Sequence, residues 1–177
     1  MPDADDPDNT AWFAVAVVPR KEKAVAQALR AKGFEDFLPL YAVRRKWSDR
    51  IQEVELPLFP GYVFSRFDSR RRLPVLTTPA VRSILGPPNF PEPIPDAEIG
   101  ALRTVCQSGI HAVPCPYLAV GSKVHIEDGP LSGIDGILVE AKQTRLILSV
   151  SLLQRSVALE VDRAWIAPVR VYREFGK

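Results

Sequence analysis

The stretch from Leu58 to Phe64 reads L-F-P-G-Y-V-F and gathers large apolar residues around a Pro-Gly step. Tyr62-Val63-Phe64 is rich in aromatic and β-branched residues and predicts a strand. Pro60-Gly61 predicts a tight turn just before it, because proline presets φ and glycine admits positive φ. We therefore expect Leu58 and Phe59 at the entrance of a sheet and only partly covered, as the rim of the core or as a docking patch.

The segments before this stretch have the periodicities of a mixed α and β domain. Trp12 to Val18 is an apolar run of strand length and predicts a buried central strand. Arg20 to Lys32 carries apolar residues at helical spacing and predicts an amphipathic helix. Phe37 to Trp47 and Ile51 to Leu56 predict the two arms of a hairpin.

The segments after it predict short elements joined by proline-rich loops. Asp68 can cap a helical turn that carries Arg70 to Arg72, and Pro74 limits that helix to about one turn. Five prolines between Pro87 and Pro95 predict a rigid, extended connector without regular structure. Asp96 is expected to cap a last helix that turns three apolar residues inward, namely Ile99, Leu102 and Val105.

The domain boundaries follow from these patterns. We expect an acidic disordered tail at residues 1–10, an α+β domain at 11–108, a linker at 109–118 and an all-β domain at 119–170. Short alternating strands with turns between them indicate that the last domain is a small barrel. No apolar run is long enough to span a membrane, and the N-terminus does not look like a secretory signal, so the expected location is the cytoplasm.

The net charge of +2 is unevenly distributed along the 177 residues. Residues 11–118 hold 15 Lys and Arg against 10 Asp and Glu, whereas residues 119–170 hold six of each kind. The excess of positive charge in the first domain suggests that it faces nucleic acid or another anionic partner.

Two clusters carry much of this charge, Arg44-Arg45-Lys46-Trp47 and Arg70-Arg71-Arg72. Basic residues beside an aromatic residue are typical of a surface that binds phosphates and stacks one base. An edge strand that is protected by charge would give the same pattern at the first cluster. The sequence leaves both interpretations open.

Catalytic and metal-binding patterns are absent from the sequence. It has no nucleotide-binding glycine fingerprint and no P-loop, and neither histidine has a nucleophile or paired carboxylates at a motif spacing. Cys106, His111 and Cys115, with His125 as a fourth candidate ligand, miss the usual spacing of zinc ligands. We therefore expect a non-enzymatic protein without a cofactor or metal, with Cys106 facing the core and Cys115 in the linker.

Together with Trp12-Phe13 and the run from Gly121 to Gly136, G-x-K-V-x-I-x-D-G-P-L-x-G-I-x-G, the opening stretch resembles the NusG family of transcription elongation factors. The resemblance extends from about Trp12 to Val169. It implies an NGN-type α/β sandwich followed by a small KOW barrel of SH3-like form. It also implies a monomeric factor that suppresses pausing or termination of transcription.

The resemblance further implies partners and the residues that contact them. The NGN domain would bind the clamp helices and gate loop of RNA polymerase, and its basic residues would contact the non-template DNA strand. The KOW domain would bind a small-subunit ribosomal protein or the termination factor Rho. The polymerase-binding residues would be Trp12, Phe13, Phe59, Tyr62, Thr77 and Thr78. The KOW residues would be Leu131, Ile134, Leu152, Leu153 and Arg155.

Some features differ from the pattern of the general factors of this family. The gate-loop region reads L-T-T-P, and Leu153 stands where many relatives have an aromatic residue. These differences favour a specialised, operon-specific antiterminator and weaken the case for Rho binding. The alternative is an RNA-binding, ribosome-associated protein with a KOW domain, although the neutral charge of residues 119–170 counts against it.

Overall fold

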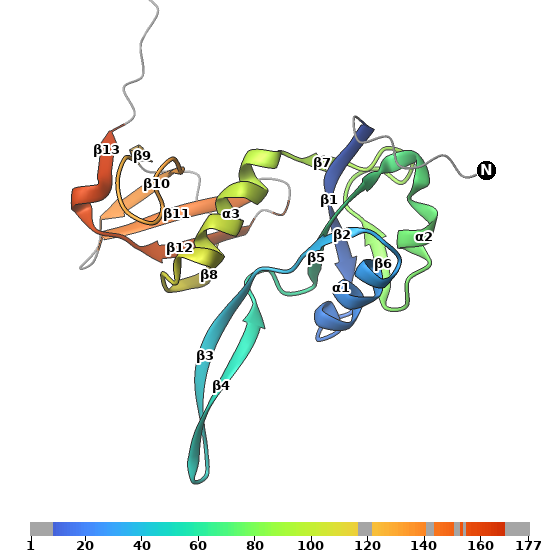
Figure 1. The fold of residues 1–177 in the computed structure, drawn as a ribbon, viewed down its shortest axis with the longest axis horizontal. Helices are drawn as coiled ribbons and strands as arrows, with labels where there is room; N and C mark the ends of the chain where they lie inside the picture. Colours follow the sequence, from blue (N-terminus) through green and yellow to red (C-terminus); the bar gives the residue numbers. More distant parts are fainter. Residues whose placement is uncertain (1–8, 117–121, 141–143, 151–152, 154, 169–177) are drawn as a thin grey trace, which may run out of the picture.

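Two antiparallel sheets and a separate hairpin organise the chain (Figure 1). The computed structural model describes residues 9–116, 122–140, 144–150, 153 and 155–168. The N-terminal elements are β1 (Thr10–Val17), α1 (Glu22–Ala31), β2 (Glu35–Phe37), β3 (Leu40–Trp47), β4 (Arg50–Pro57), β5 (Tyr62–Asp68), a 3-10 turn (Ser69–Arg71), α2 (Leu73–Leu76), β6 (Val81–Ile84), β7 (Pro93–Ile94) and α3 (Asp96–Ser108). The C-terminal elements are β8 (Ala112–Pro116), β9 (Ser122–Ile126), β10 (Asp135–Glu140), β11 (Thr144–Val150), β12 (Arg155–Glu160), a 3-10 turn (Arg163–Trp165) and β13 (Ile166–Pro168).

The first sheet has the strand order β2-β5-β1-β6, and β7 also pairs with β1. β1 runs antiparallel to β5 in a register that pairs Ala14 with Phe64 and Ala16 with Tyr62. The apolar run from Trp12 is thus confirmed as a central strand, and L-F-P-G-Y-V-F leads into the strand beside it.

The two faces of this sheet are covered by different helices. Neighbouring residues of β1 point to opposite faces, because side chains alternate along a strand. Phe13, Val15 and Val17 belong to the core cluster that includes the buried face of α1, formed by Val25, Ala26 and Leu29. Trp12 and Ala14 belong to the cluster on the other face, which includes α3.

Helix α3 buries the three apolar residues predicted to face inward, Ile99, Leu102 and Val105. The prediction that Asp96 caps this helix is wrong, because Pro95 holds the N-cap position and Asp96 is the first helical residue. A carboxylate is still favourable there, since the N-terminal end of a helix carries partial positive charge. Gly109, with φ +71, ends the helix in the left-handed conformation.

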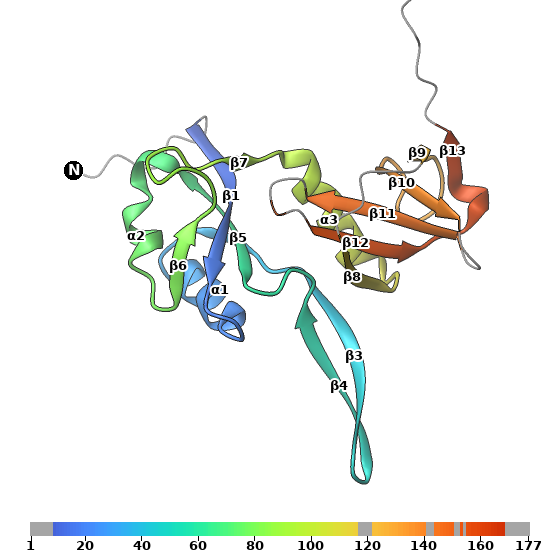
Figure 2. The same ribbon diagram turned by 180° about the vertical axis from the view of Figure 1, so that it is seen from behind.

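The predicted hairpin is confirmed as β3 and β4, which pair with no other described strand. It extends away from both sheets (Figures 1 and 2). Its first arm is shorter than predicted because Glu35–Phe37 forms β2 and pairs with β5. At its base, the amide of Leu58 donates to the carbonyl of Pro39 at 2.9 Å.

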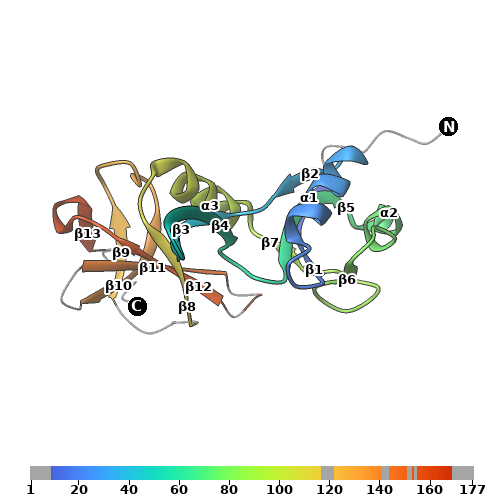
Figure 3. The same cartoon turned by 90° about the horizontal axis from the view of Figure 1, so that it is seen from below.

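The second sheet has the strand order β13-β9-β10-β11-β12-β8, and all of its pairs are antiparallel. Val124 and Ile126 of β9 and Val157 and Leu159 of β12 are buried, as their alternation with polar or small residues predicts. Helix α3 lies over this sheet (Figures 1 and 3). The predicted fold class, an α/β sandwich followed by a small all-β domain, is confirmed.

Two segments differ from expectation because proline is tolerated at particular strand positions. The segment expected as a linker contributes β8, which pairs with β12 at the end of the second sheet. Pro114 and Pro116 fit there because an edge strand has one side without partners. The proline-rich connector likewise contains β7, whose Ile94 pairs with Trp12.

Candidate functional site

The Pro-Gly step forms a type II turn that is fixed on both sides. The amide of Tyr62 donates to the carbonyl of Phe59 at 3.2 Å. Gly61 has φ +86, a backbone conformation in which a residue with a side chain would be strained. The Gly61 amide donates to Glu22 Oε1 at 2.9 Å, and the Gly61 carbonyl accepts from the amide of Val17 at 2.9 Å. The turn is therefore held by α1 and β1 together.

This turn buries the residues that precede it. Leu58 and Phe59 are 2% and 1% exposed, so the expectation that they are only partly covered is wrong. The Phe59 ring meets Phe64 edge-on, with centroids 5.6 Å apart, and Phe37 stacks on Phe64 at 6.1 Å. Phe59 therefore points into the cluster on the α3 face of the sheet.

Glu22 is buried and holds the turn with a charged acceptor. Glu22→Ala would leave the amide of Gly61 without this partner, and we expect a loss of about 1.5–3 kcal/mol in the free energy of unfolding. Glu22→Gln keeps an acceptor oxygen and should lose clearly less. Urea denaturation of both variants measures the difference. Equal losses would show that the hydrogen bond to Gly61 contributes little.

The structure separates two residues that the sequence grouped. Trp12 lies on the α3 face with Phe59 and Phe64, and half-buried Tyr62 packs against the same cluster. Phe13 lies on the α1 face, where its ring is 4.7 Å from that of Phe67. We call Trp12, Phe37, Phe59, Tyr62 and Phe64 the aromatic patch.

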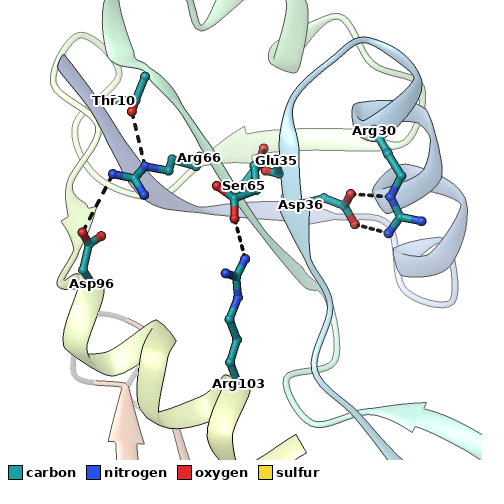
Figure 4. A network of polar contacts seen from close by, with 8 residues as sticks. All are labelled: Thr10, Arg30, Glu35, Asp36, Ser65, Arg66, Asp96 and Arg103. Carbon is teal, nitrogen blue, oxygen red and sulfur yellow. Dashed lines mark hydrogen bonds and ion pairs between the residues drawn. The ribbon is translucent and has the colours of Figure 1, made fainter. Parts of the chain in front are cut away.

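Arg103 of α3 lies over the aromatic patch. Its guanidinium carbon is 4.9 Å from the ring centroid of Trp12 and 5.4 Å from that of Phe37. Arg103 Nη2 also lies 2.7 Å from Glu35 Oε1. Figure 4 shows this arginine reaching from α3 to the strands, within a polar network that joins α3 to the first sheet.

The same network continues at the start of α3. Arg66 Nη2 lies 3.9 Å from Asp96 Oδ2, and Arg66 Nε donates to Thr10 Oγ1 at 3.3 Å (Figure 4). Because Arg66 binds the first residue of α3 and Arg103 ties the middle of the helix to the sheet, α3 is held across the aromatic patch. The position of Arg103 four residues after Ile99 places it on the inward side of the helix, but no local sequence pattern identifies its partners on the first sheet.

The buried cluster on the α3 face continues into the second domain. Leu131, Ile134 and Leu153, which the resemblance assigned to a KOW partner, are buried and belong to the same cluster as Trp12 and Phe59. Arg155 is exposed. Leu152 lies outside the described residues. A cavity of about 430 Å³ separates α3, at Ala97, Ala101 and Thr104, from the loop Ser132–Asp135.

The two threonines of the expected gate-loop contact have different surroundings. Thr77 is exposed, and its hydroxyl donates to the carbonyl of Leu73 at 3.0 Å. Thr78 is buried; its hydroxyl donates to the carbonyl of Pro74 at 3.0 Å and accepts from Lys32 Nζ at 2.9 Å. Only Thr77 is available at the surface.

The arginine cluster after β5 is partly used within the fold. Asp68 caps the 3-10 turn as predicted, because its side chain accepts from the Arg70 amide at 2.9 Å. The Arg70 side chain also binds this carboxylate, with Nη2 at 2.7 Å from Oδ2. Side-chain and backbone hydrogen bonds from Arg70 hold the pKa of Asp68 below its usual value. Arg72 Nη1 donates to the carbonyl of Ser69 at 3.2 Å.

The other basic cluster lies at the far end of the hairpin. Arg44, Arg45, Lys46 and Trp47 are all exposed on β3. The structure therefore brings neither basic cluster into the aromatic patch.

The candidate zinc ligands do not form a metal site. Among the described residues, no group of three or more His, Cys, Asp or Glu side chains could hold a metal ion. Cys106 lies exposed on α3 rather than facing the core, although partial burial of its thiol raises its pKa. His125 Nδ1 lies 2.5 Å from Asp135 Oδ1.

Among the helices that the structure describes, none has the length and apolar character that a membrane span requires.

Comparison with known proteins agrees with this architecture. A family model described as "Transcription termination factor nusG" matches residues 10–103, which is more than half of the chain. The structure is similar to a solved one, "Domain interaction in Thermotoga maritima NusG", with a TM-score of 0.57 and 17% identity over 90% of this chain and 97% of that chain. That likeness supports the fold.

Two curated relatives are named "Transcription termination/antitermination protein NusG". The protein from Buchnera aphidicola is 33% identical over 85% of this chain and 92% of its own length. The protein from Escherichia coli is 28% identical over the same shares of the two chains. This chain therefore belongs to the NusG family of transcription termination and antitermination factors.

Proposed function

We propose that this protein is a transcription elongation and antitermination factor that binds RNA polymerase through its N-terminal domain. Its aromatic patch would take the clamp helices, and exposed Thr77 would reach the gate loop. The observation that carries the proposal is the type II turn at Phe59 to Tyr62, which places the aromatic residues on one face of a rigid sheet. Aromatic side chains of this kind are typical anchors of protein interfaces.

The position of α3 adds a condition to this proposal. Trp12 and Phe59 are buried in the conformation described here, and their cluster continues into the second domain. A partner that uses these rings must first displace α3 or the second domain. Binding should therefore be stronger in variants whose domains separate more easily, because the partner then meets the competent state more often.

Ala101→Glu tests this condition. Ala101 lines the cavity between α3 and the loop Ser132–Asp135, so a carboxylate placed there must enter the partly apolar junction beside Asp135. We expect tighter binding of core RNA polymerase, by several-fold, in a pull-down or fluorescence titration. Gln107→Glu is the matched control, because Gln107 is exposed and this substitution adds the same charge to the same helix. Equal affinities of the two variants would contradict the requirement for domain separation.

The experiment that tests the proposed function is transcription across a pause site and a terminator, with and without the protein. Tyr62→Ala is the most useful variant, because Tyr62 is half-buried and its loss should leave the fold intact. Truncating an aromatic anchor at an interface typically costs about 2 kcal/mol or more, which is about 30-fold in affinity. Unchanged read-through and pausing in the presence of folded wild-type protein would refute the proposal.

For the second domain we propose the recruitment of a small-subunit ribosomal protein or of Rho. Leu131, Ile134 and Leu153 would become available to such a partner only after the domains separate, whereas Arg155 is exposed already. We propose that the protein acts as a monomer in the cytoplasm.

A further inference from the structure

The β3–β4 hairpin has two chemically different faces. Residues directly opposite each other in an antiparallel pair share a face, and successive residues alternate between faces. The register pairs Arg45 with Gln52 and Trp47 with Arg50, which places these four side chains on one face. We call this face, with Arg45, Trp47 and Arg50, the tryptophan face.

The opposite face is closer to charge balance. The register pairs Arg44 with Glu53 and Lys46 with Ile51 there, and Ala42 with Glu55 nearer the base. Glu55 in turn lies 3.3 Å from Lys23 Nζ. The acidic side chains of the two strands therefore lie on the side away from Trp47, and the tryptophan face has positive charge without an acid.

The arginines of the tryptophan face are not used by the fold. Lys23, Arg30, Arg66, Arg70 and Arg103 each have a carboxylate partner. Within the described residues, by contrast, the structure records no hydrogen bond or ion pair of the side chains of Arg45 and Arg50. Unpaired arginines on a projecting element are available to bind an anionic partner.

The exposed tryptophan indicates which kind of anionic partner the tryptophan face would bind. Trp47 is 57% exposed on a hairpin that has no core beneath its far end, and no described aromatic ring contacts it. An indole beside two arginines can stack on a base while the arginines bind the flanking phosphates. A duplex keeps its bases stacked on each other, so this combination favours an unpaired strand.

We infer that the tryptophan face of the hairpin binds single-stranded nucleic acid, with Arg45 and Arg50 on phosphates and Trp47 stacked on a base. The opposite face of the hairpin, with Arg44 and Lys46, contributes little to this binding. The proposed function supplies only the source of the strand, since a transcribing polymerase exposes single-stranded DNA and emits RNA. Arg45, Trp47 and Arg50 bind the strand, whereas Arg44 and Lys46, which lie in the same basic run, do not.

The test is fluorescence anisotropy of the full-length protein with labelled oligothymidylate, oligouridylate and a duplex of equal length, at several salt concentrations. Arg45→Ala with Arg50→Ala should reduce the log–log salt slope for the single strand by about 1.4, because two phosphate contacts are lost. Trp47→Ala should weaken binding about 5-fold or more. Arg44→Ala with Lys46→Ala removes the same charge from the other face and should change the slope by less than half as much.

All of these side chains are exposed, so the variants should melt like the wild type. Equal slope changes in the two double variants would overturn the inference in favour of diffuse attraction. Equal affinity for the duplex, or binding to acidic vesicles that depends on the same three side chains, would overturn it in favour of another partner. The comparison of the DNA and RNA strands identifies the source. The assay contains no polymerase, so its failure leaves the proposed function standing, and failure of the transcription test leaves this binding intact.

Discussion

Phe59→Ala is expected to lower the free energy of unfolding by about 3–5 kcal/mol, as truncation of a fully buried aromatic residue does. Phe59 is 1% exposed and meets Phe64 edge-on, so its removal leaves a cavity in the cluster that also holds Trp12. The turn at Pro60-Gly61 is fixed by Glu22 and Val17, which limits collapse of the site. Urea denaturation followed by circular dichroism measures the loss.

The control for this prediction is Phe90→Ala. Phe90 is 77% exposed, and its removal should change the stability by no more than about 0.5 kcal/mol. A loss below about 1 kcal/mol for Phe59→Ala would contradict the fixed position of this ring. Because Phe59 supports the fold, weaker polymerase binding by Phe59→Ala would not distinguish contact from unfolding, whereas Tyr62→Ala can.

Gly86→Ala is expected to cost about 2–4 kcal/mol, from strained backbone and a disturbed hydrogen bond together. Gly86 has φ +106, and an added Cβ would lie 2.4 Å from the backbone nitrogen of Glu92. That nitrogen donates to the carbonyl of Leu85 at 3.0 Å, which closes the loop between β6 and β7. The new methyl group would push this loop open at the edge of the first sheet.

Gly100→Ala is the matched control with the opposite sign. Gly100 lies within α3, and an added Cβ would meet nothing within 4 Å. Alanine is the better helix former, so we expect a gain of about 0.5–1 kcal/mol. Thermal melts of both variants should therefore move in opposite directions. A destabilised Gly100→Ala would show that α3 lies closer to its neighbours than described.

Much of the fold follows from local sequence patterns. The run from Trp12 predicts β1, and alternation through Val157 and Leu159 predicts β12. The spacing of Ala24, Val25, Ala28 and Leu29 predicts α1, although the structure buries Val25, Ala26 and Leu29. Each of these is a regular repeat over several residues, and such repeats are the strongest signals that a single sequence gives. The resemblance to the family rests on the stretch around the Pro60-Gly61 turn and on the glycine-rich run from Gly121 to Gly136.

The errors come from positions where tertiary context decides. Pro114 and Pro116 argue against a strand, yet β8 forms because the edge of the second sheet needs amide partners on one side only. The coverage of Phe59 depends on α3, which lies almost forty residues away in sequence. No local pattern contains that information.

The placement of Trp12 and Phe13 on different faces of the sheet could have been predicted from the sequence. Trp12 and Phe13 are neighbours on a strand, so alternation alone places them on opposite faces. The same reasoning separates Arg45 and Trp47 from Arg44 and Lys46 on β3 once the arms are paired. The roles of Glu22 and Arg103 could not be predicted, because their partners Gly61 and Trp12 lie far along the chain.

The length of the hairpin turns small movements at its base into large ones at its end. Each strand has eight residues, which span about 27 Å at about 3.4 Å per residue. A rotation of about 10° at the base would thus carry Trp47 through about 5 Å. The base adjoins a cavity of about 300 Å³ that Leu58 and the C-terminal end of α3 also line. A displacement of α3 would change the lining of this cavity, and with it the support of the base from which the hairpin projects.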